Sequence, residues 1–296
     1  MKVLLIGSNQ ITVSALATLH SLSTVNVVGV VTAPQQFQIS YAPTPVTNIN
    51  HGDLVSASKK LDIRCHVAAA GMKTSDVKDF IHRSDPNIIF VIGWHHMIPR
   101  SLTEKYLVIG IHASLLPRYR GGAPLVWAMI NGETQSGVTL FRFNESVDGG
   151  PIIDQQSFSI ESHEAIADVL VKAEVTSLDV TKRFFSEVSD VGRVRTTSQS
   201  LSDWPIWPQR TPTDGFIDPT QTWTTERLYN FIRAQSAPYP GAFAVYRERE
   251  FTIWRASGQR RIRSQCGDGI HGHENELCYR CVDGCLVIDD FAPRKQ

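Results

Sequence analysis

The 296-residue chain lacks an excess of either charge, because Lys plus Arg and Asp plus Glu each total 29. A protein that binds a polyanion over a broad surface usually carries a basic excess, so this balance argues against nucleic acid as a partner. The composition, 42% hydrophobic and 20% charged, excludes a disordered or fibrous chain. This length and composition predict a globular protein with a large core and two domains.

Long apolar runs are absent from the N-terminus. Lys2 is followed by a run of only five apolar or small residues, too short for the core of a signal peptide and far too short to cross a membrane. The five cysteines, four of which fall in the last 31 residues, do not make the disulfide framework of a secreted protein. We therefore expect a cytoplasmic protein with no membrane partner.

One cysteine pattern competes with this view. Cys278 and Cys281 form a CxxC motif, and zinc ligands of suitable type surround it at Cys266, His271, His273 and Cys285. No second CxxC is present, and Asp283 with Gly284 predicts a hairpin turn whose alternating strands already explain Cys281 and Cys285 as packing residues. We expect no metal, with zinc at this motif as the alternative.

The hydrophobic pattern predicts an α/β protein. A buried strand, "KVLLIG", is followed by a helix, "ITVSALATLHSL", and a second strand, "VNVVGVVTA". Continuous apolar strands that alternate with helices are typical of a parallel sheet covered on both faces. The pattern predicts further strands at "NIIFVIG", "LVIGIH" and "SGVTLFRF", then one long helix over residues 161–188.

The pattern changes near residue 190. Residues 191–204 show no periodicity and are predicted to be a linker between an α/β domain, 1–190, and a small, mainly β domain, 205–296. The smaller domain contains one predicted helix, "TTERLYNFIRAQS", followed by alternating strands. The fold class is therefore a Rossmann-like parallel sheet followed by a small, mainly β, C-terminal domain.

A glycine-rich phosphate loop is also missing. Gly7 ends the first predicted strand, but "SNQITV" follows it without the spaced glycines of a dinucleotide site. Open parallel sheets bind ligands at the carboxyl ends of their strands. Gly93, Trp94, His112 and the "NESVDGGPI" loop fall at such ends, which places the candidate site there.

A long segment carries a family resemblance. Residues 112–152, "HASLLPRYRGGAPLVWAMINGETQSGVTLFRFNESVDGGPI", resemble the core of the enzymes that transfer a formyl group from 10-formyltetrahydrofolate. Two later segments, "PQRTPTDGFID" and "IRAQSAPYPGAF", are similar to those of methionyl-tRNA formyltransferases and of formyltransferases acting on nucleotide-linked amino sugars. The resemblance implies a Rossmann-like catalytic domain, a small barrel-like second domain, and 10-formyltetrahydrofolate as the formyl donor.

The resemblance implies catalytic roles for His112 and Asp148. Attack of an amine on a formyl carbon needs an acceptor for the amine proton and a donor for the developing oxyanion, and a histidine can be either. Asp148 would orient the imidazole or take the proton through a water. Relatives carry a third residue, asparagine, two positions before the histidine, where this chain has Gly110.

The glycine leaves three alternatives for the function. In the first, a water or another side chain, with His95 and His96 as candidates, fills the space and transfer proceeds. In the second, the reaction is hydrolysis of the formyl donor, and in the third the protein binds folate without turnover. On the sequence alone we expect Gly110→Asn not to lower the rate.

The resemblance also assigns binding residues. A flat pterin needs apolar walls and a few backbone donors and acceptors. The predicted folate site comprises Ile92, Gly93, Trp94, Met97, Ile98, Ser114, Leu115, Leu116, Pro117, Val147 and Gly149, although Trp94 fits the core equally well. The predicted substrate site comprises Asn9, Gln10, Arg118, Tyr119 and Arg120.

The C-terminal part bears on the acceptor. Residues 205–296 contain twelve Lys or Arg and eleven Asp or Glu, which is not the basic excess that binding tRNA requires. We therefore expect a nucleotide-linked amino sugar as the acceptor, with methionyl-tRNA as the alternative. Trp204, Trp207 and Trp223 leave a homodimer open.

Overall fold

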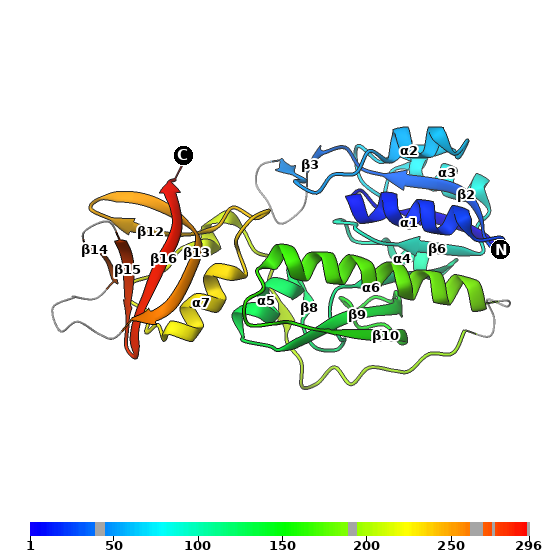
Figure 1. Cartoon of the computed structure of the whole chain (residues 1–296). Coiled ribbons are helices and arrows are strands. Elements are labelled where there is room, and N and C mark those ends of the chain that lie inside the picture. Colours follow the sequence, from blue (N-terminus) through cyan, green and yellow to red (C-terminus); the bar gives the residue numbers. More distant parts are fainter. Residues whose placement is uncertain (39–44, 189–193, 261–268, 274–275, 295–296) are drawn as a thin grey trace. The chain divides into compact units, whose positions relative to one another are not determined.

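Residues 1–38, 45–188, 194–260, 269–273 and 276–294 are described by the computed structural model of the chain (Figure 1). They form two compact units. The first consists of Met1–Arg120, Gly137–Ser157 and Ala173–Pro205, and the second of Gly121–Ser136, Phe158–Lys172 and Ile206–Gln296. Two segments that precede residue 190 in the chain therefore belong to the second unit. No helix in the described part is both long and apolar enough to cross a membrane.

A seven-stranded sheet forms the centre of the first unit. Its order is β10-β9-β7-β6-β1-β2-β5, and the five strands from β7 to β5 are parallel while β9 runs antiparallel to β7. The strands are β1 (Lys2–Ile6), β2 (Asn26–Thr32), β5 (Cys65–Val67), β6 (Ile88–Val91), β7 (Leu107–His112), β9 (Gln135–Arg142) and β10 (Ile152–Ser159). The predicted Rossmann-like class is confirmed.

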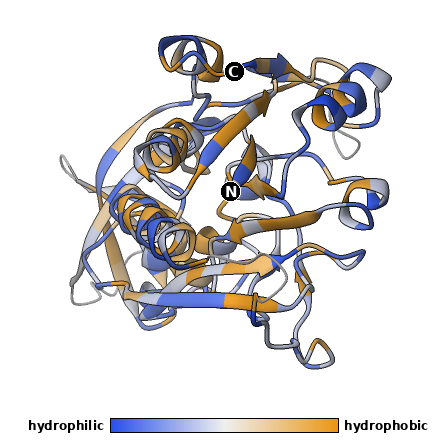
Figure 2. Cartoon of the chain, turned by 90° about the vertical axis from the view of Figure 1, so that its right-hand side faces the viewer, coloured by the Kyte–Doolittle hydropathy of each residue, from blue (hydrophilic) through white to orange (hydrophobic). Residues whose placement is uncertain are grey.

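Both faces of this sheet are covered, as the continuous apolar strands predict. On one face Leu4 and Ile6 of β1 pack in a cluster with Val77, Phe80 and Ile81 of α3 (Ser75–Ser84). On the other face lie α1 (Gln10–Ser21) and α6 (Ile166–Glu187), which are joined by a hydrogen bond from Ser14 to Glu174 and drawn side by side in Figure 1. In Figure 2 the central strands are coloured mainly as hydrophobic.

The remaining elements of the N-terminal half are short. The polar segment 34–52, expected as a loop, contains a two-stranded ladder. Asp53 caps the following helix by accepting a hydrogen bond from the Ser56 amide. These elements are β3 (Gln36–Phe37), β4 (Val46–Thr47), α2 (Leu54–Lys60) and α4 (Arg100–Thr103).

The long helix begins later than predicted. It starts at Ile166 rather than at residue 161, because Glu164 accepts a hydrogen bond from the Glu161 amide and Asp168 accepts one from the Ala165 amide. The turn that precedes the helix is thus closed by its own carboxylates.

The second unit contains a five-stranded antiparallel sheet of order β12-β13-β16-β15-β14. The end strands β12 and β14 are also in contact, so the sheet is curled, and α7 packs against β13 and β16. The elements are α5 (Pro124–Ile130), β8 (Arg120–Gly121), β11 (Ile206–Trp207), η2 (Pro212–Gly215), α7 (Thr225–Arg233), β12 (Ala242–Tyr246), β13 (Arg249–Arg260), β14 (Gly269–His273), β15 (Glu276–Cys281) and β16 (Gly284–Pro293).

The predicted C-terminal hairpin is present with its turn one residue earlier. Cys281 pairs with Gly284, so Val282 and Asp283 form the loop, and the Asp283 carboxylate accepts hydrogen bonds from the amide and hydroxyl of Thr225. Cys281 and Cys285 are both buried, which confirms them as packing residues, and burial raises the pKa of the Cys281 thiol to about 12. Cys266 lies outside the described residues.

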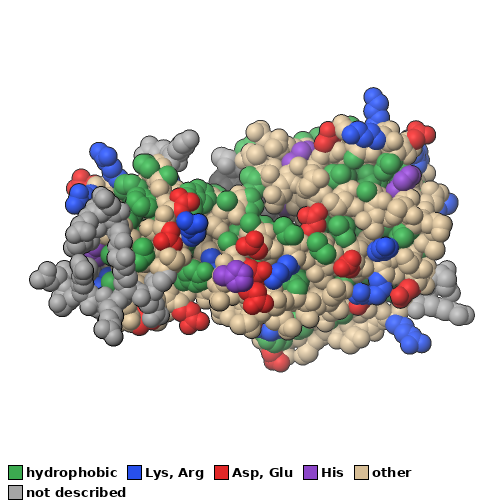
Figure 3. Space-filling model, in the orientation of Figure 1, with side chains coloured by type: hydrophobic (Ala, Val, Ile, Leu, Met, Phe, Trp, Pro, Cys, Tyr) green, Lys and Arg blue, Asp and Glu red, His purple; other side chains and the backbone are tan. Residues whose placement is uncertain are grey.

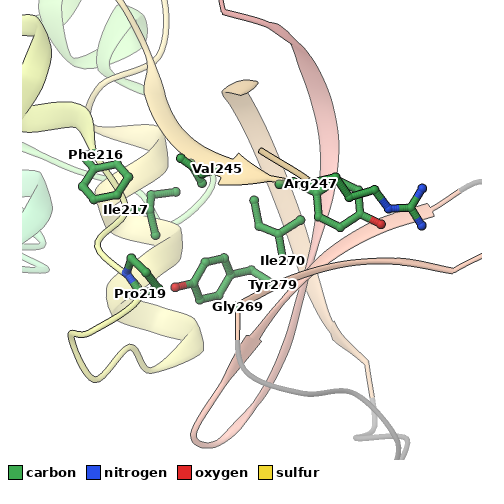
Figure 4. Close-up of a pocket in the computed structure, with 10 residues that line it drawn as sticks. Phe216, Ile217, Pro219, Val245, Arg247, Gly269, Ile270 and Tyr279 are labelled. Atoms are coloured by element: carbon green, nitrogen blue, oxygen red, sulfur yellow. The ribbon is translucent and has the colours of Figure 1, made fainter. Parts of the chain in front are cut away.

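A cavity of about 260 Å³ lies within the second unit (Figure 4). Its walls come from β12, β14 and β15 and from the segment before α7, and Ile217, Ile270 and Tyr279 contribute apolar surface. The cavity contains neither His112 nor Asp148 in its lining.

Candidate active site

His112 is the last residue of β7, and its ring is held in one orientation. Nε2 lies 2.9 Å from the backbone carbonyl oxygen of Tyr119. A carbonyl can only accept a hydrogen bond, so Nε2 carries the proton and donates it. The other nitrogen, Nδ1, lies 3.6 Å from Oδ2 of Asp148. The two side chains are only 11% and 20% exposed.

This geometry decides which nitrogen is available for chemistry. In the neutral ring the Nδ1 lone pair faces the Asp148 carboxylate at a distance longer than a hydrogen bond, so it is free to accept a proton. Once Nδ1 is protonated, the same carboxylate stabilises the resulting cation. The predicted catalytic pair is therefore brought together, with Nδ1 as the atom that can gain and lose a proton.

Asp148 is held by backbone contacts. Its φ angle is 46°, in the left-handed region, where aspartate is less disfavoured than most residues. Gln199 Nε2 donates to the carbonyl oxygens of Asp148 and Gly150, at 2.9 and 2.5 Å. Sequence reasoning missed Gln199, because it lies in a segment without periodicity that the sequence placed in the linker.

The "SLLP" loop that follows His112 is held by a second missed residue, Thr139. Its hydroxyl donates to the Ser114 carbonyl at 2.6 Å and accepts from the Leu116 amide at 3.0 Å. Gln155 Nε2 donates to the Leu116 carbonyl and to the same hydroxyl, at 2.9 Å each. Thr139 is the threonine of the "GVT" segment, residues 137–139, so this segment was the sequence signal that could have identified it.

The glycine of that motif serves the same loop. A Cβ atom on Gly137 would lie 2.5 Å from the Leu115 side chain and 2.5 Å from the Gln156 carbonyl oxygen. Only glycine allows β9 and the "SLLP" loop to approach this closely.

Gly110, the position of the usual asparagine, is covered by Phe143. A Cβ atom there would lie 2.6 Å from the Phe143 ring and 2.6 Å from the Val91 carbonyl oxygen. The side chain that fills this space is Phe143, not His95 or His96. These contacts argue against the expectation that Gly110→Asn leaves the rate unlowered, because the added side chain would overpack a filled space.

Most of the predicted substrate residues make contacts with other parts of the protein. Arg120 is 7% exposed and donates to the carbonyl oxygens of Val147 and Trp204, which ties it to the loop that carries Asp148. Arg118 lies over the rings of Tyr119 and Trp204. Asn9 Oδ1 accepts from Asn48 Nδ2 and contacts His95 Nε2, while Gln10 is exposed at the start of α1.

The predicted folate residues divide by exposure. Met97 is 68% exposed, whereas the buried ones are Ile92, Ser114, Leu116 and Gly149 and the half-buried ones are Gly93, Trp94, Ile98, Leu115, Pro117 and Val147. Trp94 and Ile98 pack against the sheet cluster.

The end of β6 nevertheless keeps two buried polar atoms without a partner. Trp94 Nε1, a donor, and His96 Nε2 have no hydrogen-bond partner in the structure, and the two rings lie 5.2 Å apart. Burial lowers the pKa of His96. A flat ligand with acceptor atoms fits such a wall. Among the described residues no cluster of three or more His, Cys, Asp or Glu could hold a metal ion.

The fold and the site together define a two-domain α/β protein with a histidine–carboxylate pair at the carboxyl end of a parallel sheet. Residues 1–178 match the formyl transferase family, and residues 210–296 match its C-terminal domain. The chain belongs to the formyl transferase family.

Similar proteins agree with this assignment. The chain is 31% identical over 182 residues to the bifunctional polymyxin resistance protein ArnA of Wigglesworthia glossinidia brevipalpis, a match that covers 60% of this chain and 27% of that protein. The chain thus spans about a quarter of that relative.

Two solved structures share the fold across the chain. The N-formyltransferase from Helicobacter canadensis, in complex with folinic acid and dTDP-3-aminofucose, has a TM-score of 0.68 at 18% identity and covers 99% of this chain and 100% of its own. HypX from Aquifex aeolicus, in complex with tetrahydrofolic acid, has a TM-score of 0.61 at 17% identity and covers 100% of this chain and 44% of its own.

Proposed function

We propose that this protein transfers a formyl group from 10-formyltetrahydrofolate to the amine of a nucleotide-linked amino sugar. The observation that carries the proposal is the His112–Asp148 pair, with Nδ1 available as a proton acceptor, in a chain of the formyl transferase family. The folinic acid and dTDP-3-aminofucose bound to the Helicobacter canadensis protein support the substrate classes.

His112 and Asp148 account for the proton that moves in this reaction. As the amine nitrogen forms its bond to the formyl carbon, His112 Nδ1 accepts the amine proton, and Asp148 stabilises the cation that results. The bond between the formyl carbon and N10 of the folate then breaks, and Nδ1 returns the proton to N10. The N–H on Nε2 stays on the Tyr119 carbonyl throughout, which keeps the ring in place.

The folate would lie at the end of β6. Trp94 and Ile98 offer an apolar wall, Trp94 Nε1 is a buried donor that the acceptor atoms of the folate can use, and His96 Nε2 is a second buried polar atom beside it. The pterin would supply a planar, hydrogen-bonding group that holds the folate, while the formyl unit is carried on N10, outside the pterin ring.

The acceptor is proposed as a small molecule rather than tRNA. On the face drawn in Figure 3, Lys and Arg alternate with Asp and Glu and form no basic patch. The near-neutral balance of residues 205–296 agrees. We also propose that the protein acts in the cytoplasm.

The test is release of tetrahydrofolate from 10-formyltetrahydrofolate, followed by absorbance. It is run without acceptor and then with dTDP- and UDP-linked amino sugars, with His112→Ala as the blank. Release that requires one of the sugars supports the proposal. Release without any acceptor would establish hydrolysis instead, and folate binding without release would establish a binder.

A salt series separates the two acceptor classes. Binding of tRNA weakens steeply with ionic strength because many phosphate contacts release counterions, whereas a sugar nucleotide presents two phosphates. We expect the KM of the sugar nucleotide to rise less than about tenfold between 50 and 200 mM salt. A change of several hundredfold, with activity on methionyl-tRNA, would favour the alternative.

A further inference from the structure

The space beside Gly110 is occupied by an aromatic ring rather than by a polar group. Gly110 pairs with Phe141 across the β7–β9 ladder, and Phe143 follows two residues later, so that it leans back over the glycine. The Phe141 and Phe143 rings stack at 4.8 Å with an angle of 25° between them.

Phe143 is held in that place from two sides. Its amide donates to the Val108 carbonyl at 2.9 Å, which fixes the backbone beside β7. Its ring packs against the cluster that contains Ile6, Val91 and Val108. The ring therefore has little freedom to move aside for a larger residue at position 110.

Two atoms of the Phe143 ring make the contact with position 110. The two Phe143 atoms nearest to a Cβ at position 110 are Cε2 at 2.6 Å and Cζ at 3.2 Å, and the third neighbour is the Val91 carbonyl oxygen. Leucine lacks both of these ring atoms, so Phe143→Leu removes the ring contact and leaves only the contact with the Val91 carbonyl.

We propose that Phe143 is a positioning residue of this site: its ring fills the space beside Gly110, two residues before His112, and so leaves proton transfer to His112 and Asp148 without a third polar side chain. The proposal rests on the proposed formyl transfer.

The proposal predicts that a larger residue at position 110 is tolerated better when residue 143 is smaller. Gly110→Asn in the wild-type background is expected to lower the thermal midpoint by roughly 4–10 °C, because it overpacks a filled space. In the Phe143→Leu background the same change should lower the midpoint by less than half as much. Phe141→Leu is the matched control, because its ring is not among the atoms nearest to position 110, and it should give no relief.

Kinetics supply the readout that a packing role alone would not move. In the Phe143→Leu background, Gly110→Asn should raise kcat about tenfold or more with the KM for the folate unchanged, because a carboxamide donor to the oxyanion enters the site. In the wild-type background, Gly110→Asn should lower kcat.

Either of two results would overturn the proposal. The first is that Gly110→Asn lowers the thermal midpoint equally in the wild-type and Phe143→Leu backgrounds. The second is that the double variant is as stable as Phe143→Leu but has the same kcat as Phe143→Leu. The thermal comparison needs no activity. If the wild-type protein transfers no formyl group, the proposed function fails, and the thermal midpoints still test whether residues 110 and 143 compete for the same space.

Discussion

The Nε2 atom of His112 donates to the carbonyl of Tyr119, and this single contact determines that Nδ1 faces Asp148. Tyr119 has a φ angle of 55°, so its carbonyl is directed by a backbone conformation that few residues adopt. The orientation of the proposed catalytic nitrogen thus depends on a turn seven residues further along the chain.

Removal of either catalytic side chain should abolish turnover while leaving folate bound. We expect His112→Ala to lower kcat about 10²- to 10⁴-fold, because the proton acceptor is lost. Asp148→Asn should have a comparable effect, since asparagine also tolerates the left-handed backbone at this position and only the charge is removed. Single-turnover kinetics and folate titration measure both quantities.

The control is Asp154→Asn, a carboxylate of the same unit that pairs with Arg183 at 2.6 Å outside the site. Near wild-type kcat in His112→Ala or in Asp148→Asn would show that the active site has been assigned wrongly.

Thr139→Val should destabilise the fold and slow the reaction. Valine keeps the shape but leaves the buried Leu116 amide and Ser114 carbonyl without the hydroxyl, at a cost of about 1–3 kcal/mol per unpaired group. Urea unfolding measures the stability. Thr103→Val on the exposed α4 is the control, because its hydroxyl bonds only within its own helix. Equal stability of the two variants would contradict the role of Thr139.

Gln199→Leu should act on kcat through Asp148. Loss of the two donations to the 148 and 150 carbonyls frees the loop, and we expect kcat to fall about tenfold, since misplacement of a catalytic group by about 1 Å is costly. The KM for the folate should change less. A change confined to KM would instead place Gln199 in substrate binding.

The burial of His96 predicts a pH dependence of stability. Its pKa is lowered by burial, so below the unfolded value of 6.5 the unfolded chain binds more protons than the folded one and stability falls as pH falls. His96→Phe keeps a ring beside Phe37 and Trp94 and should lose less thermal midpoint between pH 7.5 and 5.5 than wild type. The exposed His20→Gln is the control. Identical losses in wild type and His96→Phe would contradict the prediction.

The sequence predicted those parts of the fold that depend on local pattern. Strands β1, β2, β6 and β7 are continuous apolar runs, and α7 has one apolar face, so their positions could be predicted directly. The start of α6 could not be predicted in this way. The Glu164 carboxylate accepts from the Glu161 amide and the Asp168 carboxylate accepts from the Ala165 amide, and these contacts separate the turn from the helix. Strand β10 was missed, since it follows the "DGG" turn without a break in composition.

Of the site, the sequence predicted the pair but not its supports. His112 and Asp148 stand in a recognisable motif, whereas the Phe143 ring reaches Gly110 only through the register of β7 with β9. Gln199 reaches Asp148 from 51 residues away. Register and long-range contacts of this kind leave no periodic signal in one sequence.

The division of the chain into units also has a consequence for protein engineering. Segments 121–136 and 158–172 belong with the C-terminal unit, where Ile130 packs on its core and Arg233 donates to the Glu161 and Glu164 carbonyls. A chimera that grafts only residues 206–296 onto a relative would leave these partners behind. Exchange of the C-terminal unit between relatives therefore calls for three coordinated crossover segments, not one.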